Sequence, residues 1–130
     1  MIDYRLGPMV DYDRLITLFA GAGWSDKIVD PKRLQAMVEN SQLVVTAWDG
    51  ALMVGFARCT TDHEFNGQIN NVVVDPLYRK RGVGRQLIQR IVDSNGKVTY
   101  VLRADPSSLD FYRRLGFRSA ETALVYGRKE

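Results

Sequence analysis

The sequence predicts a mixed α/β fold built on a central, mostly antiparallel sheet. Short β-branched apolar runs alternate with stretches whose apolar residues recur at helical spacing. Asp49-Gly50 lies between two such runs and is the strongest hairpin signal in the chain. The runs Ile69–Val74 and Val98–Arg103 are joined through a helix, so these two strands should run parallel. The 130 residues predict a single domain, 1–130, with one core.

The first third of the chain predicts one strand and two helices. Met1–Leu6 alternates like a short strand. Tyr12–Ala20 carries apolar residues at helical spacing, and Asp11 or Asp13 is placed to cap that helix. Pro31 then opens a second helix that runs to about residue 40, because proline is well tolerated in a first helical turn.

The middle of the chain predicts an antiparallel meander followed by a helix. Gln42–Trp48 and Ala51–Cys59 flank the hairpin turn. The third strand, Ile69–Val74, follows a polar, turn-rich stretch at 60–67. Apolar residues between Leu87 and Val92 then return at helical spacing, which predicts an amphipathic helix after the third strand.

The last third predicts a strand, a helix and a final strand. Val98–Arg103 is β-branched and aromatic, and Pro106 starts a helix that Gly116 ends. Phe117–Gly127 is predicted to be the last strand. Its free edge would offer a place for two chains to pair, so a homodimer stays open.

Composition favours a globular protein, because 45% of the residues are hydrophobic and 25% are charged. The net charge of +3 is mild, and many cations gather in two clusters, Arg79–Arg85 with Arg90 and Arg113-Arg114. Such clustering suits a small polyanionic ligand better than an extended nucleic-acid face.

Cysteine content and hydropathy limit the remaining classes. The single cysteine, Cys59, excludes an internal disulfide and a cysteine zinc cage, and it is most simply a small buried apolar residue. No segment resembles a signal peptide or a membrane span. We therefore expect a protein of the reducing cytoplasm, with no metal and no membrane or nucleic-acid partner.

The most informative stretch runs from Asn70 to Ser94. Its strand ends at Asp75-Pro76, because proline lacks the N–H group that a ladder needs. The turn Arg79–Gly84 then leads into a helix whose first N–H groups are unpaired and point the same way. With the helix dipole these groups form an anion site, typically for phosphate, and the two glycines allow close approach. The alternative is an ordinary start of a helix.

Two common phosphate motifs are absent from this turn. It lacks the Lys-Ser/Thr of the nucleoside triphosphate P-loop and the three glycines of the dinucleotide fingerprint. The order Arg79-x-x-Gly82-x-Gly84, after a Val-Asp-Pro strand end, instead resembles the acetyl-CoA motif of the GNAT superfamily of N-acetyltransferases. The resemblance implies a sheet that splays between the fourth and fifth strands and carries helices on both faces. It also implies that acetyl-CoA, the co-substrate, enters the gap.

A second stretch, Phe111-Tyr112-Arg113-Arg114-Leu115-Gly116-Phe117, resembles the family pattern Phe/Leu-Tyr-x-x-x-Gly-Phe. The resemblance implies that the Tyr112 hydroxyl lies near the CoA sulfur and protonates the departing thiolate. A phenol with an ordinary pKa of about 10 holds its proton at neutral pH. The alternative is a packing tyrosine whose hydroxyl is hydrogen-bonded. Arg113 and Arg114 either reach the nucleotide phosphates or lie on an exposed helix face.

The same resemblance implies the contacts with the coenzyme. Main-chain groups of Val72, Val73 and Val74 should pair with the pantetheine arm. The pyrophosphate should bind backbone N–H groups in the turn: Arg79, Lys80, Arg81, Gly82, Val83, Gly84, Arg85 and Gln86. Asp105 stands near the place of a family asparagine that contacts pantetheine, and an aspartate cannot donate amide protons.

The general base is left open by the sequence. Some family members use a glutamate on the third meander strand, but Gln68 stands at or near that position and cannot accept a proton there. Asn70 and Asn71 cannot do so either. The preceding turn offers Asp62, His63 and Glu64. Among them His63 has the best suited pKa, and a water chain ended by backbone carbonyls is equally open.

Trp24 is the candidate for acceptor binding. It follows the first predicted helix, where the resembled fold places the wall of the acceptor pocket, and its ring can cover an amine. The alternative is a tryptophan that closes the core.

The sequence thus predicts an N-acetyltransferase that moves the acetyl group of acetyl-CoA to a primary amine by direct attack. The acceptor is a small-molecule or peptide amine of unknown identity, because variable loops build its pocket. No acyl-enzyme is expected, since Cys59 has no histidine partner in a recognisable motif. The alternatives are a CoA-binding sensor without turnover and, from the basic turn, a nucleic-acid-binding domain with steeply salt-dependent affinity.

Overall fold

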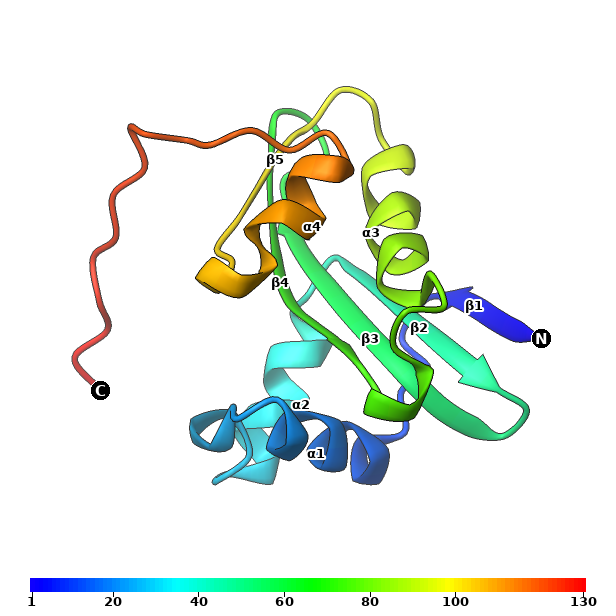
Figure 1. Ribbon diagram of the computed structural model, residues 1–130. Coiled ribbons are helices and arrows are strands. Elements are labelled where there is room, and N and C mark those ends of the chain that lie inside the picture. Colours follow the sequence, from blue (N-terminus) through cyan, green and yellow to red (C-terminus); the bar gives the residue numbers. More distant parts are fainter.

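The computed structural model describes residues 1–130, which form one sheet with helices on both faces (Figure 1). The strands are β1 (Ile2–Leu6), β2 (Leu43–Asp49), β3 (Leu52–Thr61), β4 (Asn66–Val74) and β5 (Thr99–Leu102). The helices are α1 (Tyr12–Gly21), α2 (Pro31–Glu39), α3 (Val83–Asp93) and α4 (Leu109–Arg114). Short 3₁₀ turns lie at Ser25–Lys27, Pro76–Tyr78 and Pro106–Ser108.

The strand order in the sheet is β1-β2-β3-β4-β5, the order in which the strands follow along the chain. The first three pairs are antiparallel, and β5 joins β4 in parallel. The hairpin predicted at Asp49-Gly50 connects β2 to β3, with Gly50 at a φ of 60°. The mixed, mostly antiparallel sheet and the parallel pair predicted from the sequence are therefore confirmed.

Side-chain caps explain where the first two helices begin. Asp11, and not Asp13, caps α1 by accepting from the Arg14 N–H group at 3.1 Å. Asp30 caps α2 by accepting from the amide of Lys32, and Pro31 follows it in the first turn. α3 has no side-chain cap, since its N-cap is Gly82.

The two faces of the sheet carry separate cores, as Figure 1 shows for the helices that cover them. Helices α1 and α2 cover one face, where Phe19 packs edge-on against Phe56 with ring centroids 5.9 Å apart. Helix α3 covers the other face through Leu87, Ile88 and Ile91. The apolar spacing of both helices matches these contacts, which explains why the predicted helical stretches are helical.

The sheet splays between β4 and β5. β5 pairs only with the first residues of β4, from Asn66↔Thr99 to Ile69↔Leu102. From Asn70 to Val74, β4 has no strand partner on that side. The polar main-chain groups of this end of β4 are left for a ligand or solvent.

The predicted last strand, Phe117–Gly127, is wrong. The segment has no ladder hydrogen bonds, and its backbone bonds are the local ones from Phe117 to Tyr112 and from Ala123 to Ala120. Figure 1 shows it running away from the helices in an extended course. Its apolar residues, such as Leu124 and Tyr126, are exposed, so β propensity alone lacked a partner to stabilise a strand.

None of the helices is long and apolar enough to cross a membrane.

Candidate active site

A cleft of about 710 Å³ opens where β4 and β5 diverge. Its walls come from the unpaired end of β4, the turn before α3, the end of α1 with the loop after it, and the start of α4. Of the residues predicted for the site, the cleft brings together Trp24, Val72, Val73, Val74, Arg79, Lys80, Gly82, Val83, Gly84, Arg85, Asp105 and Tyr112. Segments far apart in the sequence therefore converge on one hollow.

The turn before α3 presents free N–H groups to this cleft. Lys80 and Gly82 are both left-handed, with φ of 63° and 81°, and they reverse the chain into the helix. The first intrahelical bond runs from the Gln86 N–H to the Gly82 carbonyl at 3.0 Å. The N–H groups of Val83, Gly84 and Arg85 thus have no intrahelical acceptor and lie at the positive end of the dipole.

Two residues of the predicted anion site lie elsewhere. The N–H group of Gln86 is used within the helix, and its side chain lines a separate hollow with Tyr4 and Arg90. Arg81 lies over the ring of Tyr78, 5.1 Å from its centroid, and does not line the cleft. The free N–H groups are therefore concentrated between Gly82 and Arg85.

An ion pair fixes the end of β4 where the turn begins. Asp75 accepts from Arg14 Nη2 at 2.8 Å and from the Leu77 N–H at 2.9 Å. Arg14 also donates through Nε to the Met53 carbonyl at 2.9 Å. The hydrogen bond from Arg14 is the main reason that the pKa of Asp75 lies below its usual value. Helix α1 and strand β3 are tied to the turn in this way.

Tyr112 lines the cleft from α4 and has a half-buried side chain. Its ring packs edge-on against Phe111 and Phe117, with centroids 5.0 and 5.7 Å away. Burial raises the pKa of its phenol above 10, and the charge of Asp105 adds to this rise. The hydroxyl makes no hydrogen bond within the chain, so it is a protonated donor that the fold has not used.

Other residues of the cleft were not singled out from the sequence as binding residues. Ser107 and Ser108 line it from the 3₁₀ turn, and Phe111 lines it from α4. Of the two arginines that the sequence left open, Arg114 lines the cleft, while Arg113 does not and donates to Asp110 at 3.5 Å. The sequence signal that could have identified Ser107 and Ser108 was their position at the start of a predicted helix, just after the end of a strand.

The three proton acceptors suggested by the sequence lie outside the cleft. Asp62 accepts from the N–H groups of Glu64, Phe65 and Asn66, which lower its pKa and use its carboxylate to close the β3–β4 turn. Glu64 pairs with Lys97 at 3.2 Å. His63 is exposed and left-handed, with φ of 66°. The carboxylate that does line the cleft is Asp105.

Trp24 contacts both the core and the cleft, and acceptor binding by this residue stays a prediction. One edge packs into the core against Phe19, with centroids 5.0 Å apart, and the residue also lines the cleft. Cys59 is fully buried, as expected for a small apolar side chain.

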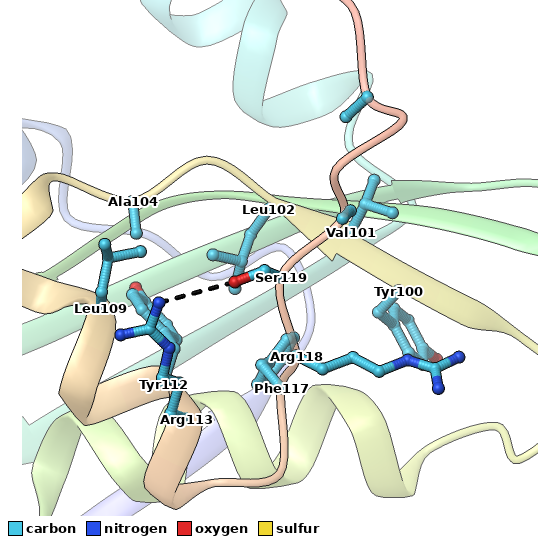
Figure 2. A pocket seen from close by; sticks show the side chains of 12 residues that line it. Tyr100, Val101, Leu102, Ala104, Leu109, Tyr112, Arg113, Phe117, Arg118 and Ser119 are labelled. Carbon is cyan, nitrogen blue, oxygen red and sulfur yellow. Dashed lines mark hydrogen bonds between the residues drawn. The ribbon is translucent and has the colours of Figure 1, made fainter.

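A second, apolar hollow of about 300 Å³ lies behind Tyr112, between β5, α4 and the C-terminal segment. Figure 2 shows its side chains, with the Arg113 guanidinium directed toward the Ser119 hydroxyl, which it reaches at 3.5 Å. Val101 and Leu109 form part of the wall and remain partly exposed. Tyr112 belongs to the walls of both hollows.

The fold and the site together define a class of α/β domain in which a free helix N-terminus lies beside a splayed sheet, an arrangement that suits a phosphate group. The chain matches the family described as acetyltransferase (GNAT) domain over residues 11–126, and it belongs to this family. The family identified from the two sequence motifs is thereby confirmed.

Relatives and solved structures agree with this family. A histone acetyltransferase, TAP1, of Glycine max is 31% identical over 134 residues, covering 91% of this chain and 56% of the relative. A probable acetyltransferase of methicillin-resistant Staphylococcus aureus has a TM-score of 0.83 at 20% identity, covering 98% of this chain and 99% of that one. A predicted acetyltransferase of Clostridium acetobutylicum, solved with acetyl-CoA, has a TM-score of 0.72 at 17% identity, covering 98% and 96%.

These likenesses carry different weight. The chain spans 56% to 63% of the length of the first two curated relatives that it matches. The two structural likenesses, at 20% and 17% identity, establish the fold.

Proposed function

We propose that this domain transfers the acetyl group of acetyl-CoA to a primary amine of a small molecule or peptide. The observation that carries the proposal is the cleft itself. Free N–H groups of Val83–Arg85, the unpaired end of β4 and the unused hydroxyl of Tyr112 all border one hollow. The acetyltransferase family and a fold neighbour solved with acetyl-CoA support the choice of co-substrate.

In this proposal the turn binds the coenzyme pyrophosphate. The N–H groups of Gly82 to Arg85 donate to its oxygens, and the helix dipole adds to their field. Arg79, Lys80 and Arg114 supply positive charge at the same wall. Main-chain groups of Val72–Val74 pair with the pantetheine arm, because no strand uses them on that side.

Tyr112 acts as the general acid. Acetyl-CoA supplies an activated acetyl group that the neutral amine takes by direct attack, so no residue of the chain carries the acetyl group. The Tyr112 hydroxyl donates its proton to the departing thiolate, the attacking nitrogen releases one proton to solvent, and Tyr112 regains a proton from solvent. Because its pKa is raised, Tyr112 holds this proton throughout the neutral range. Trp24 forms the wall against which the acceptor lies.

A screen of amines with thiol detection tests the proposal. We expect CoA release with at least one class of amine, and Tyr112→Phe to lower kcat by about 10²-fold with little change in acetyl-CoA affinity. Tyr100→Phe is the matched control, because Tyr100 lies on β5 and outside the cleft. Unchanged turnover in Tyr112→Phe would remove this residue from the mechanism.

The second candidate is a CoA-binding sensor without turnover. It is favoured by one observation, that Asp62, His63 and Glu64 all lie outside the cleft. Tight binding of CoA with no thiol release on any amine would support the sensor over the enzyme. Cytoplasmic location and pairing of two chains stay predictions, to be checked by fractionation and light scattering.

A further inference from the structure

Strand β4 carries a bulge at the point where it separates from β5. In a regular strand Ile69 and Val73 would face the same side, because side chains alternate with a period of two. Ile69 instead packs in the α3-side core and Val73 in the α1/α2-side core. The register with β3 explains this, since Arg58 pairs with Asn70 and Phe56 with Val73. Two residues of β4, at 71 and 72, therefore oppose one residue of β3.

The bulge requires Asn71 to adopt a left-handed backbone. Its φ is 53°, a region that costs residues with a side chain roughly 1 kcal/mol, although asparagine tolerates it better than most. The Asn71 side chain is held in turn, since its Oδ1 accepts from Arg58 Nε at 2.7 Å. A long-range side-chain bond thus secures an unfavourable local conformation.

Arg58 is suited to this task by its position and its remaining contacts. It lies on β3, partly buried, and its Nη1 donates to the Ser41 hydroxyl at 3.3 Å just after α2. No carboxylate lies within 4.0 Å of the guanidinium, so its bonds go to neutral partners. The guanidinium therefore joins the bulge to the end of α2.

The backbone conformation of Asn71 sets the orientation of the next three residues of the strand. Val72, Val73 and Val74 line the cleft and have no partner on the β5 side. Without the bulge, the register of β4 with β3 would shift by one residue after Asn71. The N–H and C=O groups of these valines that now face the cleft would then point to the opposite side. The same shift would also expel Val73, which is 5% exposed, from its core.

We propose that Arg58 is a positioning residue for the cleft: by holding Asn71 left-handed, it sets which main-chain groups of Val72–Val74 face the bound thioester. This inference rests on the proposed acetyl transfer. Arg58 does not line the cleft, so it acts through Asn71 and not by touching the reacting atoms.

A double-mutant cycle with Arg58→Met and Asn71→Gly tests the proposal. Glycine adopts a positive φ without a side-chain bond, so the bulge no longer needs Arg58 in that background. We expect Arg58→Met alone to lower kcat about tenfold, since a small misplacement near the thioester is costly. In the Asn71→Gly background the same change should lower kcat less than about twofold. Coenzyme affinity should fall less than kcat, by no more than about threefold, because the pyrophosphate turn is untouched and only the pantetheine contacts of Val72–Val74 are disturbed.

Two further variants sharpen the cycle. Arg58→Lys keeps the charge but loses the planar fork that reaches Asn71 and Ser41, so it should not restore kcat. Arg33→Met removes an exposed arginine of α2 and should change nothing. Amide resonances of residues 71–74 should move in Arg58→Met and stay near their single-variant positions when Asn71→Gly is already present.

An equal loss of kcat in both backgrounds would overturn the inference, because Arg58 would then act without Asn71. A lower melting temperature with unchanged kcat and unchanged resonances would overturn it as well, leaving a purely structural residue. The two proposals fail differently. A wild-type chain that never releases thiol ends the proposed function and this inference with it, whereas full turnover in Arg58→Met ends the inference alone.

Discussion

The chain up to Ile91 and the chain after it differ in packing, although both border the cleft. All buried residues lie between Leu15 and Ile91, in the two cores that β1–β4 share with α1, α2 and α3. From residue 92 onward no residue is buried, and this part includes β5, α4 and the C-terminal segment. The turn before α3 lies in the part of the chain up to Ile91, which is called the buried part here although residues 79 to 82 are themselves exposed; Tyr112 and Asp105 lie after Ile91, in the exposed part.

This difference in burial predicts that the two walls of the cleft differ in local stability. The turn before α3 is anchored by the α3 core and by the Arg14–Asp75 pair. Tyr112 is only partly buried: it packs edge-on against Phe111 and Phe117 and lies at the margin of the α3-side core. Local opening should therefore reach the wall that carries Tyr112 at lower free energy than the wall formed by the turn before α3.

The largest expected effect is on stability in the buried part. Leu87 is fully buried on α3, so Leu87→Ala should lower the free energy of unfolding by about 3 kcal/mol through lost burial and a cavity. Leu109→Ala, at a residue of α4 that is 39% exposed, should cost less than about 1 kcal/mol. Urea denaturation measures both, and similar losses would contradict the contrast.

The next effect concerns the turn. Gly82 has a φ of 81° with open space where a Cβ would lie, so Gly82→Ala adds strain without a clash. Strain of about 1–2 kcal/mol should weaken acetyl-CoA binding roughly tenfold as the turn relaxes. Gly96→Ala, in an exposed turn without positive φ, should bind normally. Titration calorimetry compares them, and equal affinities would show that the turn tolerates the strain.

A smaller effect is expected from the ion pair at the start of the turn. The pKa of Asp75 is lower in the folded chain than in the unfolded one, so its charge stabilises the fold above about pH 4. That contribution is lost as pH falls through the lower, folded pKa. Asp75→Asn should cost less than about 1 kcal/mol at pH 7, because the pair is partly solvated, and the difference should vanish in acid. Denaturation curves between pH 7 and pH 3 test this, and a constant difference would exclude the charge as its cause.

The smallest effect concerns Cys59, whose thiol is expected not to react in the folded chain. Burial raises the pKa of the Cys59 thiol to about 11, so at pH 8 it should react with a disulfide reagent only after unfolding. Val101→Cys would place a thiol on β5 at a position that is 50% exposed, and it should react within the folded chain. Rapid labelling of Cys59 in the wild-type chain would show that the buried part opens readily.

The sequence predicted those features that depend on local signals. Asp49-Gly50 marked the hairpin, Pro31 marked the start of a helix, and Arg79 to Gly84 marked the turn, because each is decided by residues next to it in the chain. Most predicted site residues, from Val72 to Tyr112, converge on the cleft for the same reason. Their places are determined by strand ends and helix starts.

The features that the sequence did not predict depend on contacts between residues far apart in the chain. Phe117–Gly127 contains residues that favour strands, but a strand also needs a neighbouring strand to pair with. β propensity does not reveal that this segment forms no ladder with β5. Asn71, at the bulge, accepts a hydrogen bond from Arg58, 13 residues earlier, and no spacing rule marks the pair. The orientation of Arg81 over Tyr78 is likewise a tertiary contact that a run of cations does not disclose.

Tyr112 lies between two hollows, the cleft and a second one lined mainly by apolar side chains from β5, α4 and the C-terminal segment. A small apolar molecule bound in the second hollow would contact Tyr112 without occupying the cleft proposed for acetyl-CoA. Under the proposed function, raising the acetyl-CoA concentration would not displace such a molecule, so it would inhibit without competing with the co-substrate.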